Sequence, residues 1–117
     1  MSATQTPGVV TLYVAGPMTG LVDFNYPAFN TAAQQLRNAG YAVLNPVDSK
    51  AENTTGESQT WEWYLRRALR MVTRADGIAL LPGWEGSRGA RLEVEVAREL
   101  GMWTRDLPEW LAVLRTT

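Results

Sequence analysis

The segment GIALLPGWEGSRGARLEVEVARELG, residues 77–101, contains the pattern that decides the fold. It begins with the short apolar run GIALL, passes through a loop rich in Gly, and ends in a stretch with the spacing of an amphipathic helix. A buried strand that leads through a loop into a helix is the repeating unit of α/β proteins. We therefore expect further units of the same kind elsewhere in the chain.

Apolar runs and helical patterns do alternate along the sequence. Strands are expected at 9–16 (VVTLYVAG), 41–46 (YAVLNP), 77–81 and 102–104, and helices after Asn25, from Trp61, from Ser87 and after Asp106. The order β-α-β-α-β-α-β-α predicts a parallel sheet with helices on both faces. The expected fold class is α/β, a three-layer sandwich around a small parallel sheet of four to five strands, flavodoxin- or Rossmann-like.

Length and composition predict one domain at residues 9–117, because 117 residues with 45% hydrophobic content suffice for one core. Residues 1–8 (MSATQTPG) lack the features of a signal peptide, and we expect them to be disordered. The polar segment 47–60 is long for a loop, which predicts either disorder or a lid. No apolar run approaches the roughly 18–20 residues of a membrane span, and we expect a cytoplasmic protein without a membrane partner.

The charge and the missing residue types limit the chemistry. A net charge of −1 does not favour nucleic acid as a partner. The chain has no Cys and no His, which excludes disulfides, thiolate nucleophiles, His-based triads and the common zinc sites. The loop Gly16-x-x-x-Gly20 does not fit the dinucleotide fingerprint, and no Walker loop occurs. We therefore expect no metal and no cofactor, and either carboxylate chemistry or no chemistry.

Glu93 is the sharpest candidate for a functional residue. On a helical wheel Glu93 lies near the middle of the apolar face of the third helix, while the other charges share the opposite face. The apolar face is predicted to consist of Ala90, Val94, Val96, Ala97, Leu100 and Gly101. Burial of an unpaired carboxylate costs several kcal/mol, so Glu93 is either paired with an Arg, near the helix edge, or held at a ligand site. A carboxylate at a ligand site can act as a nucleophile without His.

Ligands of parallel α/β sheets bind beyond the carboxyl ends of the strands, near a switch point. The three loops expected there supply the candidate binding residues Gly16, Pro17, Met18, Asn45, Trp84, Ser87, Arg88 and Gly89. Ser87 is a plausible N-cap, and the amides after it can hold an anion at the positive end of the helix. The aromatic side chains Trp61, Trp63, Tyr64 and Trp84 belong to the core or an interface, or stack a base. Asp76, before the third strand, is a candidate cap or catalytic group.

The segments TLYVAGPMTG, AVLNP, DGIALLPGW and GSRGARLEVEVARELG together resemble the DUF4406 family of small, often phage-encoded proteins. That family in turn resembles a branch of the nucleoside 2-deoxyribosyltransferase superfamily. In this superfamily a Glu early in the third helix attacks the anomeric carbon of a deoxyribosyl group and is followed by x-Gly-x-Ala. Glu93 and Ala97 match the motif, whereas Glu95 stands in place of the Gly.

The resemblance also implies roles for other residues. Transferases carry Asp at the position of Ser87, and relatives that hydrolyse deoxynucleoside monophosphates carry Ser, so Ser87, Arg88 and Gly89 would suit a 5′-phosphate. Gly16, Pro17 and Met18 match the loop that lines the sugar and base. Candidates for the general acid are Asp76, Asp23 and Tyr13. The family often has an Asp where LRRAL (65–69) stands here, and its absence leaves room for binding without efficient turnover.

Two functions follow as expectations from this resemblance. One is cleavage or transfer of the N-glycosidic bond of a deoxynucleoside or its 5′-monophosphate by Glu93. The other is a non-catalytic protein that sequesters or senses a nucleotide. A homo-oligomer, dimer or tetramer, is expected in both cases, because five Trp residues leave much apolar surface to cover.

Overall fold

The computed structural model describes residues 8–48 and 60–113. Strands and helices alternate as the sequence predicts. The strands are β1 (Thr11–Ala15), β2 (Ala42–Leu44), β3 (Gly77–Leu80) and β4 (Trp103–Asp106); the helices are α1 (Tyr26–Asn38), α2 (Trp61–Arg74), α3 (Arg88–Glu99) and α4 (Leu107–Ala112); and two short 3-10 helices are η1 (Val22–Asn25) and η3 (Trp84–Gly86). Most of the expected disordered start and candidate lid, residues 1–7 and 49–59, lies outside the described residues.

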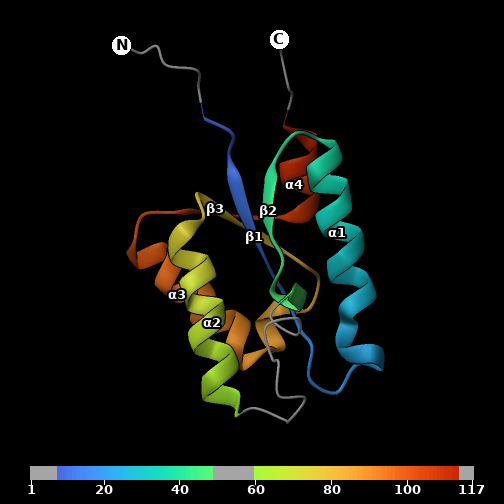
Figure 1. The fold of residues 1–117 in the computed structure, drawn as a ribbon, viewed down its shortest axis with the longest axis vertical. Helices are drawn as coiled ribbons and strands as arrows, with labels where there is room; N and C mark the ends of the chain where they lie inside the picture. Colours follow the sequence, from blue (N-terminus) through green and yellow to red (C-terminus); the bar gives the residue numbers. More distant parts are fainter. Residues whose placement is uncertain (1–7, 49–59, 114–117) are drawn as a thin grey trace.

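The sheet has four parallel strands in the order β2-β1-β3-β4. Helices α1 and α4 cover one face of this sheet, and α2 and α3 cover the other (Figure 1). The predicted three-layer α/β sandwich is therefore confirmed. The chain moves outward from β1 to β2 and then crosses back to β3, so the switch point lies between the carboxyl ends of β1 and β3.

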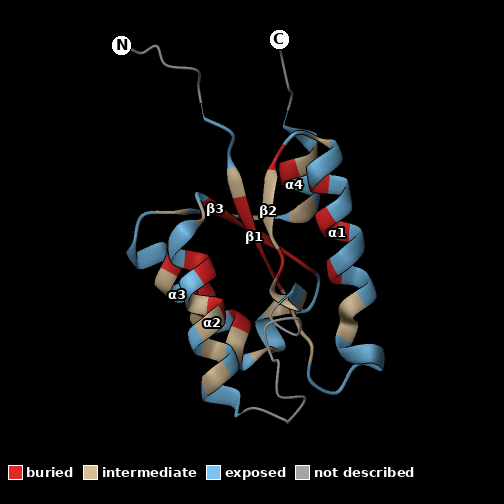
Figure 2. Ribbon diagram, in the orientation of Figure 1, coloured by how far each residue is buried: buried red, intermediate tan, exposed pale blue. Residues whose placement is uncertain are grey.

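The alternation of side chains along β1 connects the two cores. Leu12 and Val14 pack in the cluster shared with α1 and α4, whereas Tyr13 and Ala15 pack in the cluster shared with α2 and α3. All four side chains are buried, as the central strands in Figure 2 show. The Tyr13 side chain therefore lies on the face of the sheet that α2 and α3 cover.

The start of α1 is a strained turn that the side chain of Asn25 does not cap. The Asn25 side chain does not cap α1; its amide donates a hydrogen bond to the carbonyl oxygen of Pro17 at 2.9 Å. Asp23, Phe24 and Asn25 all have left-handed backbones, with φ values of 52°, 52° and 62°. Such a conformation costs a non-Gly residue roughly 1–2 kcal/mol. The bond from Asn25 helps to hold this strained turn against the loop after β1.

The last strand and helix lie close to their predicted positions. The fourth strand runs to Asp106, two residues beyond the prediction, and the Asp106 amide donates to the Glu109 carboxylate at 2.9 Å as α4 begins. Trp110 is buried, and its indole N–H donates to the carbonyl of Ile78 at 2.8 Å. No helix in the described part of the chain is long and apolar enough to cross a membrane.

Candidate functional site

A cleft of about 890 Å³ opens at the carboxyl edge of the sheet, beside the switch point. The residues around it come from the end of β1 and the loop that follows, from η1 and the start of α1, and from the first turns of α2 and α3. Its volume is within the range of small-molecule sites. The cleft therefore lies where parallel α/β folds bind their ligands.

Glu93 forms part of the cleft wall and is only 8% exposed. It shares the buried face of α3 with Ala90, Val94 and Ala97, as the helical wheel predicts. The expected apolar face is wrong at its C-terminal end, because Leu100 is 57% exposed and Gly101 is also exposed beyond the last turn. No Arg among the described residues forms an ion pair with Glu93; its Oε2 accepts a hydrogen bond from Tyr13 Oη at 2.9 Å.

The Tyr13–Glu93 pair is electrostatically unusual. Burial raises the pKa of Glu93 to about 8, while the hydrogen bond from Tyr13 favours the ionised form and lowers it. Burial and the neighbouring Glu93 raise the pKa of Tyr13 well above its usual value. Tyr13 therefore keeps its proton and donates to Glu93 across the physiological range.

The start of α3 provides a polar side to the same cleft. Ser87 is the N-cap, and its Oγ accepts from the Ala90 amide at 3.2 Å, as predicted. The amides of Arg88 and Gly89 have no hydrogen-bond partner within the described residues. An added Cβ on Gly89 would meet no atom within 4 Å. These amides and the helix dipole favour an anion next to Ser87.

Arg88 adds a full positive charge to this side. Its guanidinium lies 3.8 Å from the centre of the Trp61 ring, at the first turn of α2. Both side chains line the cleft, and Arg88 is exposed. The stacking holds the cation beside the helix start while leaving its donors available.

The loop after β1 forms the floor of the cleft through Gly16, Pro17 and Met18. A Cβ on Gly16 would lie 2.7 Å from the Cβ of Leu81, so this glycine is required by the packing of β1 against the chain after β3. The Pro17 carbonyl accepts the bond from Asn25 that anchors the strained turn. All three predicted residues thus lie in the cleft with Glu93.

Aromatic side chains form much of the remaining lining of the cleft, here called the aromatic wall. Trp61 and Tyr64 of the predicted aromatic set line the cleft, whereas Trp63 packs edge-on against Tyr64 with ring centres 4.8 Å apart. Three further aromatic residues belong to this wall and were not predicted as site residues: Phe24, Tyr26 and Phe29. Their occurrence within six positions directly after the β1 loop was the available signal.

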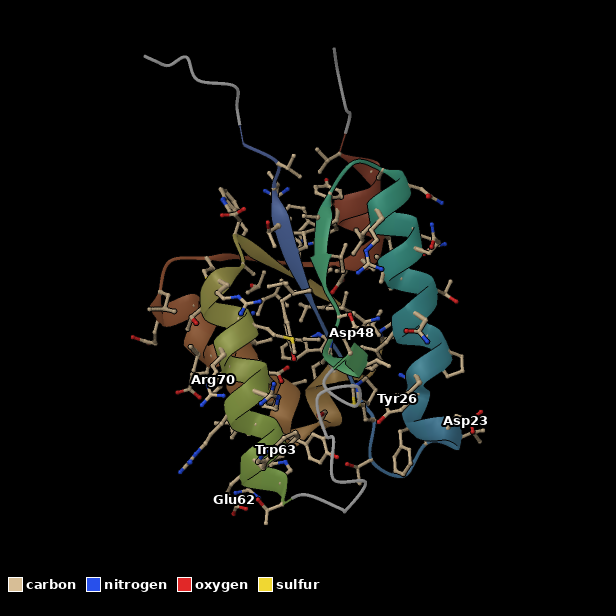
Figure 3. The ribbon with its side chains drawn as sticks, viewed as in Figure 1. Asp23, Tyr26, Asp48, Glu62, Trp63 and Arg70 are labelled. Atoms are coloured by element: carbon tan, nitrogen blue, oxygen red, sulfur yellow. The ribbon has the colours of Figure 1, made fainter. Side chains whose placement is uncertain are left out.

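Four sequence candidates lie elsewhere. Asp76 is at the amino end of the sheet, where its Oδ2 accepts from the Thr11 amide at 2.8 Å. Asn45 is buried; its side-chain amide donates a hydrogen bond to the Asn30 side chain, and its side-chain oxygen accepts one from the Val47 amide. Trp84 packs against the α2–α3 core, and Asp23 points outward before α1 (Figure 3). None of the four lines the cleft. Among the residues described, no three acidic side chains gather as a metal site would require.

The fold is that of a parallel α/β protein, and the cleft at the carboxyl end of its sheet contains a buried carboxyl group. The chain belongs to the family described as "Domain of unknown function (DUF4406)", whose model matches residues 10–105. A search of curated proteins gives no match.

Proposed function

We propose that the protein cleaves or transfers the N-glycosidic bond of a deoxynucleoside or deoxynucleoside 5′-monophosphate, with Glu93 as the nucleophile. The observation that carries this proposal is the Glu93 carboxyl group, buried at the ligand end of the sheet with one neutral hydrogen-bond donor. A carboxyl group without an ion pair is costly to bury, and a fold that keeps one in a cleft commonly uses it. The resemblance to nucleoside 2-deoxyribosyltransferases supplies the reaction class.

The reaction would follow the two steps of a retaining glycosidase. Ionised Glu93 attacks the anomeric carbon, the bond from that carbon to the base nitrogen breaks, and the base leaves with the bonding electron pair and takes up a proton. Water then attacks the glycosyl-enzyme and releases the sugar and the carboxylate, or a second base attacks and gives transfer. Tyr13 would hold the attacking carboxylate through the hydrogen bond from its hydroxyl group.

The other sides of the cleft suit the two ends of such a substrate. A base can stack on the aromatic wall, to which α2 contributes Trp61 and Tyr64 and the chain around the start of α1 contributes Phe24 and Tyr26. A 5′-phosphate can accept hydrogen bonds from the amides of Arg88 and Gly89 and from the Arg88 guanidinium. These contacts favour the monophosphate over the nucleoside.

The second candidate function is nucleotide binding without turnover, as a sequestering or sensing protein. The observation that favours it is the lack of a second acidic group in the cleft. Glu93 is the only carboxyl group among the described residues that line it. The segment LRRAL (65–69) has no Asp where the resembled family often carries one, and the high pKa of Tyr13 makes it a poor acid. The departing base would then have to take its proton from water.

Base release decides between the two. Each deoxynucleoside and its 5′-monophosphate is incubated with the wild type, with Glu93→Gln and with Glu85→Gln, a matched change at an exposed carboxylate outside the cleft. Free base is separated by chromatography, and a glycosyl adduct on Glu93 is sought by mass spectrometry. The proposal expects release by the wild type and Glu85→Gln only. Release by Glu93→Gln at the wild-type rate would overturn it, and binding without release by any form would establish the second function.

The resemblance also supports a cytoplasmic protein of bacterial or phage origin that acts as a homo-oligomer. Sedimentation at micromolar concentration tests the oligomer directly.

A further inference from the structure

Phe24, an aromatic residue of the cleft, is held there by a strained backbone. Its φ of 52° lies in the left-handed region, which is costly for a bulky residue, and Asp23 and Asn25 on either side share this conformation. The Phe24 side chain nevertheless stays 59% exposed while it lines the cleft. Burial of the ring in the protein therefore offsets little of the strain, and strain of this kind is typical of ligand-binding segments.

Hydrogen bonds fix this turn relative to the floor of the cleft. The Phe24 amide donates to the Leu21 carbonyl at 2.9 Å, and the Leu21 amide donates to the Met18 carbonyl at 3.2 Å. The side-chain amide of Asn25 donates to the Pro17 carbonyl at 2.9 Å. Pro17 and Met18 both belong to the floor. The bond from Asn25 is made by a side chain, so a substitution can remove it without changing the neighbouring residues.

Phe24 differs from the other exposed apolar residues of this turn in its position at the cleft. Val22 is 86% exposed, but it is not among the described residues that line the cleft. The centre of the Phe24 ring lies 5.8 Å from that of Tyr26, which also lines the cleft, and the two planes are inclined by 41°. The two rings are therefore not stacked on each other, and a planar ring of a ligand can cover the exposed part of Phe24.

We propose that Phe24 is a specificity-determining residue that packs on the aromatic base of the ligand, and that Asn25 is the positioning residue that holds Phe24 for this contact. The bound base buries the ring and so offsets the strain that the free protein carries. The turn is already formed before binding, so that little conformational entropy is lost when the base arrives. The identity of the ligand as a nucleotide rests on the function proposed above, but neither role requires that the ligand be cleaved.

Substitution of Phe24 tests the contact with the base. Binding is measured by calorimetric titration in the Glu93→Gln protein, so that the ligand is not consumed. The probes are the common deoxynucleoside 5′-monophosphates and 2-deoxyribose 5-phosphate, which has no base. Phe24→Ala should weaken binding of the monophosphates about tenfold, as loss of a base-stacking partner does, and leave binding of the sugar phosphate unchanged. Val22→Ala, in the same turn but away from the cleft, is the matched control and should change neither.

Asn25→Gly tests the positioning role, because Gly accepts the left-handed backbone but has no side chain to donate to the Pro17 carbonyl. It should weaken binding of the monophosphates about fivefold, since Phe24 is no longer held. In the double variant with Phe24→Ala, the Asn25→Gly change should have little further effect, because its effect on binding passes through Phe24. A purely structural role of Asn25 would instead give two effects that add.

Thermal unfolding tests the strain without any ligand. Phe24→Gly should unfold at a higher temperature than Phe24→Ala, because Gly adopts a φ of 52° without strain; the reverse order would count against the proposal. Unchanged monophosphate binding in Phe24→Ala or Asn25→Gly, or additive effects in the double variant, would overturn the two roles and leave the proposed function standing. If neither the wild type nor Glu93→Gln binds any monophosphate, the proposed function fails, and the contact between Phe24 and a base fails with it.

Discussion

At the scale of single residues, the burial of Glu93 makes folding stability depend on pH. Its folded pKa of about 8 lies above the unfolded value near 4.5, so the folded state binds more protons between these pH values. Stability from this group is therefore lost as pH rises from about 4.5 to 8. Glu93→Gln removes the titration and should stabilise the protein by about 1–3 kcal/mol at pH 7–8, with little effect at pH 4.5. Urea unfolding at both pH values measures this.

A Glu85→Gln control, at an exposed position, should show no such pH-dependent gain. If Glu93→Gln instead destabilised the protein at pH 8, the carboxylate would be held by a strong charged partner, and its structural role would outweigh its burial.

The same pKa predicts the pH dependence of any reaction that uses ionised Glu93. Because the pKa of Glu93 is raised to about 8, the neutral acid predominates at pH 7, so kcat/KM should rise with pH and level off above about 8. Tyr13→Phe removes the hydrogen bond that lowers this pKa and should move the rise to higher pH. Rates of base release from pH 6 to 9.5 measure both profiles; a shift to lower pH in Tyr13→Phe would contradict the assigned role of the bond.

At the scale of elements, variants of the first turn of α3 can separate its capping role from its proposed role in phosphate binding. Asp and Asn are both good N-caps, so Ser87→Asp and Ser87→Asn should keep the bond to the Ala90 amide and the stability of the helix. Only Ser87→Asp adds a negative charge, which should weaken monophosphate binding about tenfold or more and spare the nucleoside. Calorimetric titration of both ligands measures this. Equal weakening of both ligands by Ser87→Asp would remove Ser87 from the phosphate site.

Most elements could be predicted from the sequence because their apolar residues follow the period of a strand or a helix. Ser87 as a cap and Glu93 on the buried face of α3 follow from local pattern alone. The left-handed turn at Asp23, Phe24 and Asn25 could not be predicted, since it contains no Gly and is held by a bond to the distant Pro17 carbonyl. That turn carries Phe24 to the cleft, and so part of the aromatic wall was missed.

The side-chain directions of Asn45 and Trp84 depended on tertiary contacts that no local pattern carries. Asn45 follows β2 at the ligand edge, but its side chain is used by Asn30 and the Val47 amide. Trp84 lies in the loop after β3, but it turns into the core. For such residues the sequence predicts the end of the sheet at which they lie, but it does not predict the direction in which the side chain points.

At the scale of the whole molecule, Glu93 and Asp76 lie at opposite ends of the parallel sheet. The carboxyl edge holds Glu93 and the cleft, and the amino edge holds Asp76, whose carboxylate accepts from the Thr11 amide that starts β1. Asp76→Ala should therefore lower stability by about 1 kcal/mol, because an exposed hydrogen bond to the backbone is lost. Base release or nucleotide affinity per folded molecule should be unchanged, since Asp76 does not line the cleft.

Urea unfolding and the base-release assay on Asp76→Ala, each normalised to folded protein, measure the two effects independently. Loss of base release in a stable Asp76→Ala protein would instead indicate that Asp76 is the general acid. The substrate would then have to extend to the amino end of the sheet. The expected result, lower stability with full function, would mean that this molecule divides stability and ligand chemistry between opposite ends of one four-stranded sheet.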